Sequence, residues 1–216
     1  MIIGQQSGFR RKEWAQDHSH LRKYKDIQRN VDGSSSAFIL SDFEFRGKNN
    51  RRIAQDSNTE VSKACIVDIK WRFQKNNDNG QIISYVADNL NKIHCYLRAF
   101  KRIRERAIRL KQALDKPIAI YTANLKDRKI KYIDNIHVID ILQEAAKAVY
   151  HITNRDELNR FTSHSIRVGA CVLLHSQNTS TEDIKFRLRW HSDSFRMYLR
   201  NIIQLAERYK NAVAKA

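Results

Sequence analysis

The chain has 216 residues, of which 42% are hydrophobic, and this length is enough for one domain with a full core. No apolar run approaches the roughly 18–20 residues of a membrane span, so no membrane partner is expected. The formal charge of +17 favours a polyanionic partner, usually nucleic acid, although a merely basic, solvated surface carries the same charge.

The three cysteines, Cys65, Cys95 and Cys171, are odd in number and scattered along the chain. This pattern predicts reduced thiols in an intracellular protein. With nucleic acid as partner, we expect it to lie with DNA, in the nucleus if eukaryotic, or in the cytoplasm and nucleoid if not. Neither paired zinc-ligand spacing nor an Asp and Glu cluster for a two-metal site is seen, so no metal and no cofactor are expected.

The first half of the chain predicts a small antiparallel sheet. Residues 5–16 favour a helix end, residues 17–36 favour a loop, and residues 37–45 have strand character. Residues 63–73 alternate between apolar and polar side chains, and residues 81–86 close a hairpin with them. The apolar face of residues 63–73 is expected to carry Cys65, Val67, Ile69, Trp71 and Phe73, and the opposite face Asp68, Lys70 and Arg72.

The second half predicts helices. Apolar residues at helical spacing run through 89–114, which Pro117 ends, and residues 118–134 are mixed and favour an extended segment. Four further helices are expected over 134–152, 163–176, 181–190 and from about 193 to the end, with Asp134 or Asn135 and Thr181 as caps. The predicted fold class is α+β, mainly α, with a sheet of about three strands in the N-terminal half.

Candidate catalytic residues gather in the last third of the chain. His164 and Arg167 are three residues apart, which places them on one face of a helix. His191 follows Arg167 by 24 residues and Tyr198 follows it by 31. Cleavage of a phosphodiester requires a nucleophile, neutralisation of the phosphoryl charge and a proton for the leaving oxygen. Arginine, histidine and tyrosine in a basic protein supply these functions without metal.

Three motifs in this order resemble the catalytic domain of the tyrosine recombinases of the phage-integrase type. SGFRRKE, which contains Arg10 and Glu13, is similar to the family's TGxRxSE box. HSIR, from His164 to Arg167, matches its H-x-x-R box. WHSDSFRMY, which ends at Tyr198, is similar to its LGHS…Y box. The resemblance covers essentially the whole chain and implies the fold of DNA breaking-rejoining enzymes.

The resemblance implies a site-specific DNA recombinase or integrase. Tyr198 would attack the phosphate and form a covalent 3′-phosphotyrosine without metal or ATP. Arg10 and Arg167 would neutralise the phosphate, with Glu13 as structural partner of Arg10.

The remaining catalytic roles are also implied by the resemblance. Lys75 would protonate the leaving 5′ oxygen, with Lys70 nearby as the other candidate. His164 would help take the tyrosine proton, and His191 would hydrogen-bond a phosphate oxygen. Five further basic residues are predicted to contact DNA: Arg11, Lys70, Arg72, Arg189 and Arg196.

Two departures from the family pattern stand out. The step from His191 to Tyr198 is shorter than in typical bacterial members, and Trp190 stands where glycine is usual; both features resemble divergent members from mobile elements of eukaryotes and large viruses. Residues 1–216 are expected to form the catalytic domain, without the family's N-terminal core-binding domain and first helix. The resemblance also implies a homotetramer on DNA that exchanges C-terminal helices.

Other interpretations remain open. The chain is alternatively a catalytically inactive DNA-binding remnant of a mobile element, a relaxing enzyme similar to type IB topoisomerases, or a basic RNA-binding protein. Taken alone, Tyr198, Trp71 and Trp190 are most simply core aromatics. Four arginines between residues 102 and 109 favour a solvated or DNA-facing helix side: Arg102, Arg104, Arg106 and Arg109.

Overall fold

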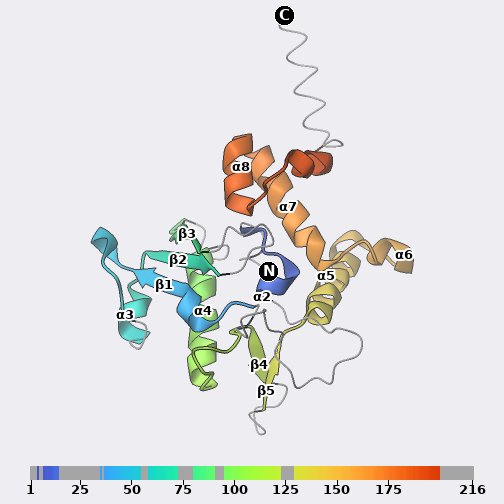
Figure 1. Cartoon of the computed structure of the whole chain (residues 1–216). Helices are drawn as coiled ribbons and strands as arrows, with labels where there is room; N and C mark the ends of the chain where they lie inside the picture. The colour runs from blue at the N-terminus through green and yellow to red at the C-terminus, as the bar shows by residue number, and fades with distance from the viewer. Residues whose placement is uncertain are drawn as a thin grey trace, which may run out of the picture. The chain divides into compact units, whose positions relative to one another are not determined.

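The computed structural model describes residue 4 and residues 7–14, 35, 37–54, 58–72, 80–90, 95–122 and 129–199. The chain forms two compact units. The sheet unit consists of Arg10–Ser163 and Ile2. The C-terminal unit consists of His164–Ala216, Ile3–Phe9 and Met1. The predicted class is confirmed, because the structure is mainly helical and has a three-stranded antiparallel sheet in its N-terminal half (Figure 1).

The sheet consists of three antiparallel strands in the order β1-β2-β3. Their bounds are Phe43–Arg46 for β1, Ile66–Trp71 for β2 and Gln81–Val86 for β3. The predicted alternation of β2 is confirmed for Val67, Ile69 and Trp71, which are at most 1% exposed, and for Lys70, which is exposed. Central strands whose apolar face is covered show this pattern.

Two expectations for the sheet are wrong in detail. The predicted strand at 37–45 begins only at β1, because Leu40–Asp42 form a short 3₁₀ helix, η1. The Asp42 carboxylate accepts the N–H of Ile39, the N-cap residue of η1, at 2.9 Å.

Asp68, expected on the polar face, is 3% exposed. Its carboxylate pairs with Arg46 and accepts the Ser84 hydroxyl at 2.6 Å, so hydrogen bonds compensate its burial.

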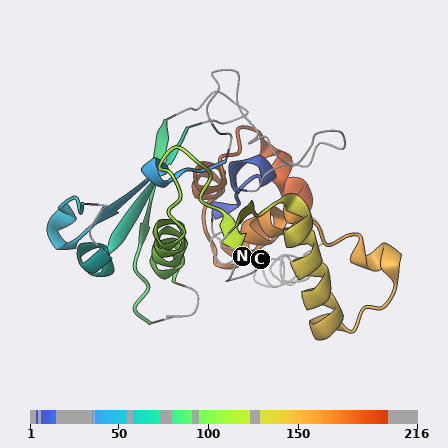
Figure 2. The ribbon, with the colours of Figure 1, turned by 90° about the horizontal axis from the view of Figure 1, so that it is seen from below.

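Helix α4, Tyr96–Arg109, packs along β2 and β3 (Figure 2). It begins later than predicted, with Cys95 as its N-cap residue. The ring of Phe100 lies 5.1 Å from that of Phe43 and 6.0 Å from that of Tyr85. These contacts fix which face of α4 is buried.

Short elements complete the sheet unit. Helix α5 begins as predicted, because the Asp134 carboxylate accepts the His137 N–H at 3.1 Å. The segment expected to be extended contains the two-stranded sheet of β4 and β5. The bounds are Arg11–Trp14 for α2, Lys48–Asn50 for η2, Asn58–Ser62 for α3, Ile120–Thr122 for β4, Ile130–Tyr132 for β5, Asn135–Tyr150 for α5 and Arg155–Leu158 for α6. Helices α3 and α6 were not predicted.

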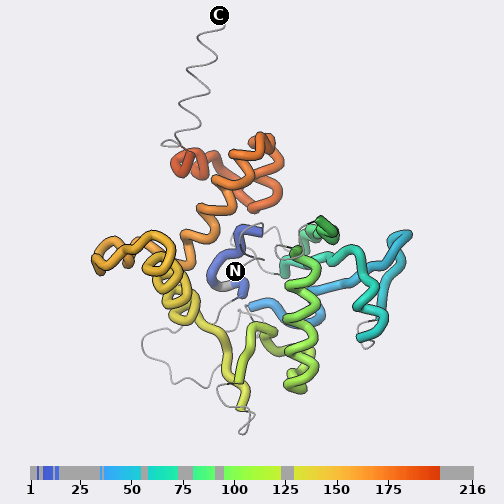
Figure 3. The backbone as a smooth tube through the Cα atoms, turned by 180° about the vertical axis from the view of Figure 1, so that it is seen from behind, coloured from blue at the N-terminus to red at the C-terminus, as the bar shows by residue number. Residues whose placement is uncertain are grey.

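In the C-terminal unit the backbone runs from α7 (Ser163–Ser176) through α8 (Thr181–Leu188) to the 3₁₀ helix η3 (Asp193–Leu199), as Figure 3 shows. The bounds of α7 are those predicted. The predicted cap of α8 is wrong by one residue, because the hydroxyl of Ser180, not of Thr181, accepts the Asp183 N–H at 3.0 Å. The predicted last helix is a 3₁₀ helix over 193–199, and residues 200–216 lie outside the described part.

The core of the C-terminal unit is built by residues from all three helices. They are Ala170, Cys171, Ile184, Leu188, Phe195 and Leu199. Trp190 and Tyr198 pack against this cluster as partly buried residues. In neither unit do the described residues form a helix with the length and apolar content needed to cross a membrane.

Candidate active site

Tyr198 and His164 meet in the C-terminal unit. His164 lies in the first turn of α7 and Tyr198 near the end of η3. The imidazole Nε2 lies 3.0 Å from the phenol oxygen, and the ring centroids are 5.6 Å apart at 64°. When Nε2 carries no proton, the tyrosine hydroxyl donates to it. That arrangement is the one in which histidine acts as a general base toward a phenol.

The surroundings of His164 favour its neutral form. Partial burial lowers the pKa of His164 below its ordinary value of 6.5, and the positive charge of Arg167 lowers it further. Both causes disfavour a second positive charge on the ring. The imidazole is therefore available as a proton acceptor near neutral pH.

Arg167 is buried beside this pair, with only 5% of its surface exposed. Its Nη1 donates to the carbonyl of Gly8 at 2.5 Å, and its Nη2 donates to the carbonyl of Leu188 at 2.6 Å. Its Cζ lies 4.5 Å from the centre of the Trp190 ring. These contacts fix the position of the guanidinium in the C-terminal unit.

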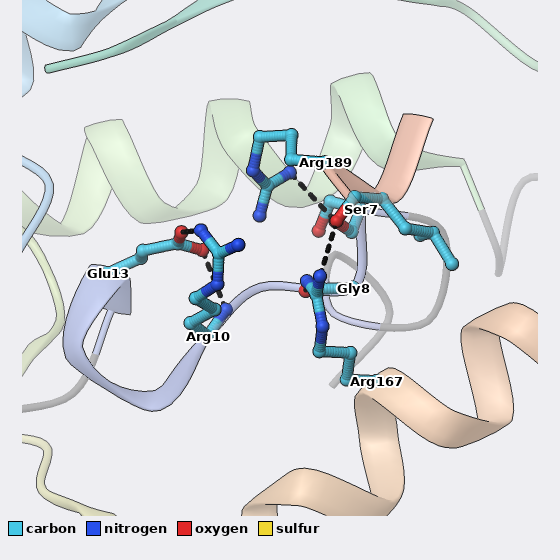
Figure 4. A network of polar contacts seen from close by, with 7 residues as sticks. Ser7, Gly8, Arg10, Glu13, Arg167 and Arg189 are labelled. Atoms are coloured by element: carbon cyan, nitrogen blue, oxygen red, sulfur yellow. Dashed lines mark hydrogen bonds and ion pairs between the residues drawn. The ribbon is translucent and has the colours of Figure 1, made fainter. Parts of the chain in front are cut away.

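The N-terminal segment is part of this site despite its distance in sequence. Gly8 and Arg167 are 159 residues apart, and Arg189 Nη1 donates to the carbonyl of Ser7 at 3.1 Å (Figure 4). Gly8 has φ of +52°, and a Cβ there would lie 2.8 Å from Leu188 Cδ2. Only glycine fits this turn without strain, which explains the glycine of the SGFRRKE motif.

Trp190 is a functional candidate that the sequence interpretation missed, since it was taken as a core residue. Its ring lies 5.7 Å from the ring of Tyr198 at 64°. Its Nε1–H is buried and has no hydrogen-bond acceptor among the described residues. A buried donor next to a candidate nucleophile is suited to bind an oxygen of a ligand. Its position directly before His191 was the available sequence signal.

Arg10 belongs to the sheet unit, where Glu13 holds it. The Glu13 carboxylate accepts the Arg10 backbone N–H at 2.6 Å, and its other oxygen lies 3.4 Å from Arg10 Nη1 (Figure 4). A glutamate at the third position of a helix commonly binds the N-cap N–H in this way. The contact between Arg10 and Glu13 that the resemblance implies is therefore present.

His191 and Lys75 are two further predicted catalytic residues. His191 is exposed, at the bend before η3. Lys75 falls within residues 73–79, outside the described residues, so its role stays a prediction. The structure thus brings together His164, Arg167 and Tyr198, and adds Trp190.

The predicted DNA contacts fall into two groups. Arg11, Lys70 and Arg196 are exposed. By contrast, Arg189 is 3% exposed and donates to the Ser7 carbonyl. The Nε of Arg72 lies 2.6 Å from the Asp42 carboxylate, and its Nη2 donates to the Ala37 carbonyl at 3.1 Å. A surface role in DNA binding does not fit these two residues, because the fold itself uses their guanidinium groups.

Among the residues that the structure describes, no group of three His, Cys, Asp or Glu side chains is placed to hold a metal ion. No model of a protein family, no curated protein and no solved structure matches the chain. The recombinase interpretation thus stays a prediction based on the motifs and on this geometry.

Proposed function

We propose that the protein breaks and rejoins DNA through Tyr198, as a tyrosine-type recombinase or integrase. The observation that carries the proposal is the 3.0 Å contact between His164 Nε2 and Tyr198 Oη beside the buried guanidinium of Arg167. A phenol is a weak nucleophile at neutral pH, and an adjacent neutral imidazole activates it by taking its proton.

In the proposed reaction the Tyr198 oxygen attacks phosphorus and the bond from phosphorus to the 5′ oxygen breaks. His164 takes the phenol proton, and the leaving 5′ oxygen receives a proton from Lys75, the residue implied by the family resemblance. The products are a 3′-phosphotyrosine and a free 5′ hydroxyl. Attack of a 5′ hydroxyl on the phosphotyrosine reverses the step, restoring the phosphodiester and releasing Tyr198. Arg167 contributes a fixed positive charge to the phosphoryl group, and the Trp190 indole N–H contributes a donor.

A second candidate function is DNA binding without cleavage, as in an inactive remnant of a mobile element. One observation favours it: both terminal nitrogens of Arg167 donate to backbone carbonyls, of Gly8 and Leu188. Direct binding of phosphate by these nitrogens then requires one carbonyl to be released. In this alternative Arg167 serves only to hold the C-terminal unit together.

A covalent-trapping experiment tests the proposal without knowledge of the target sequence. Nicked duplexes of randomised sequence are incubated with the full chain, and protein–DNA adducts that survive denaturation are isolated. We expect adducts whose modified peptide contains Tyr198, and none with Tyr198→Phe. If Tyr198→Phe gives the same adducts, or if binding occurs with no adduct in any variant, the cleavage proposal is wrong.

The chain offers a matched control. Tyr121 Oη lies 2.8 Å from His137 Nε2, so this pair makes the same contact in the sheet unit. His137 Nδ1 lies 2.8 Å from the carboxylate of Asp134, whereas the residue that lowers the pKa of His164 is Arg167. We expect Tyr121→Phe to leave adduct formation unchanged. This result would show that adducts are not lost merely because a phenol bonded to a histidine has been removed.

A further inference from the structure

Helix α4 carries four arginines on its exposed side. They are Arg98, Arg102, Arg106 and Arg109. Within the described part of the chain, none of the four guanidinium groups forms a hydrogen bond or an ion pair. Spacings of three and four residues place them along one side of the helix over about 16 Å. Glu105 lies within this row and is also exposed, so the row has a net positive charge of three from four arginines and one glutamate.

The opposite side of α4 fixes the orientation of this row. Leu97, Phe100 and Ala107 are at most 2% exposed, and Phe100 packs on the sheet. The helix cannot rotate to bury its arginines without exposing this apolar side. The row is therefore a permanent feature of the surface of the sheet unit.

Two other cations of α4 have structural roles and do not belong to the row. Arg104, which the sequence grouped with its neighbours, is 3% exposed and donates to Asn58 Oδ1 at 2.7 Å. Lys101 Nζ donates to the carbonyls of Ser62 at 2.7 Å and Ala64 at 3.0 Å. The structure thus separates two groups of cations on α4. Lys101 and Arg104 bind α3 and the loop after it, whereas the four arginines of the row face solvent.

We propose that the arginine row of α4, which consists of Arg98, Arg102, Arg106 and Arg109, binds the phosphate backbone of duplex DNA. This row belongs to the sheet unit, whereas Tyr198 belongs to the C-terminal unit. The choice of DNA as the polyanion rests on the proposed function. A duplex presents about ten phosphate charges along 16 Å of its axis, more than enough for four guanidinium groups. Guanidinium binds phosphate through paired donors and never loses its charge near neutral pH.

The composition of this side favours duplex DNA over other polyanions. Proteins that bind single strands stack bases on exposed aromatic rings, whereas the two aromatic residues of α4, Tyr96 and Phe100, are buried. Helices that bind a membrane surface insert an apolar side into it, whereas the apolar side of α4 packs on the sheet.

Salt-dependent binding to an intact duplex of random sequence tests this proposal. Arg102→Gln in the full chain is expected to reduce the slope of log K against log salt by about 1 and to weaken binding roughly eightfold at 0.1 M salt. Arg155→Gln removes the same charge from an exposed position on α6 and is the matched control, expected to change binding little. Glutamine is a good helix former, so unfolding temperatures should agree.

A variant of opposite sign sharpens the test. Glu105→Gln removes the one negative charge from the row and is expected to strengthen binding roughly threefold. Equal effects of Arg102→Gln and Arg155→Gln, or no gain from Glu105→Gln, would overturn the proposal. A larger loss with single-stranded RNA or with phosphatidylserine vesicles than with duplex DNA would overturn the choice of partner.

Covalent trapping at saturating DNA separates this proposal from the proposed function. Arg102→Gln that weakens binding while the Tyr198 adduct still forms supports both. Adducts together with equal effects of the two arginine variants reject the α4 surface alone. Binding that depends on Arg102 without any adduct rejects cleavage and supports the α4 surface.

Discussion

His164 Nε2 lies 3.0 Å from Tyr198 Oη, joining two residues that are 34 positions apart in the chain. Tyr121 and His137 make the same contact at 2.8 Å over 16 positions. The contact alone therefore does not define an active site. The first pair is distinguished by the Arg167 charge that lowers the pKa of His164 and by the Trp190 ring beside Tyr198.

Titration of His164 is expected to have its midpoint below pH 6.5, because burial and Arg167 both lower its pKa. NMR of the ring proton in the Tyr198→Phe protein, with assignment from His164→Asn, measures this directly. Since protonation is easier in the unfolded chain, the contribution of His164 to stability is present above about pH 6.5 and is lost as the pH falls. A midpoint at or above 6.5 would contradict the described environment.

Trp190→Phe keeps an aromatic ring against Arg167 and Tyr198 but removes the buried indole N–H. We expect the rate of adduct formation to fall by about 10²–10³-fold, as for loss of one donor to a developing charge, with little change in stability. Single-turnover trapping gives the rate, and denaturant unfolding gives the stability. An unchanged rate would mean that the indole N–H has no role in the reaction.

Gly8→Ala is expected to destabilise the protein by about 1–2 kcal/mol or more, because φ at residue 8 is +52° and the new Cβ would meet Leu188 Cδ2 at 2.8 Å. Gly169→Ala, in the interior of α7 with nothing within 4 Å of the added Cβ, is the control and is expected to stabilise by about 0.5–1 kcal/mol. Urea unfolding of both variants measures the difference. Equal effects would show that the Gly8 turn is not needed for stability.

Cys171 is expected to resist alkylation in the folded protein near pH 8. Its side chain is fully buried, and burial raises the pKa of the thiol to about 11, so the reactive thiolate is scarce. Iodoacetamide labelling followed by peptide mass spectrometry measures its modification. Full modification in urea serves as the control, and rapid labelling of the native protein would contradict the burial of the Cys171 side chain.

Local pattern predicted much of the fold. The alternation of residues 63–73 predicted β2, and α7 was predicted with the bounds Ser163–Ser176 because its apolar residues recur at helical spacing. The beginning of α4 was not predicted correctly, since the apolar spacing continues N-terminal to Tyr96. Periodicity identifies an element more reliably than its ends.

The order of the three motifs, the basic composition and the periodicity of strands and helices are determined by the sequence itself. Only the tertiary structure decided what each arginine does. Arg167 and Arg189 are buried against carbonyls of the segment at residues 7 and 8, whereas the arginine row of α4 faces solvent. A guanidinium has the same charge in either place. Whether it binds a backbone carbonyl or remains in water depends on contacts between segments some 160 residues apart, which no local pattern encodes.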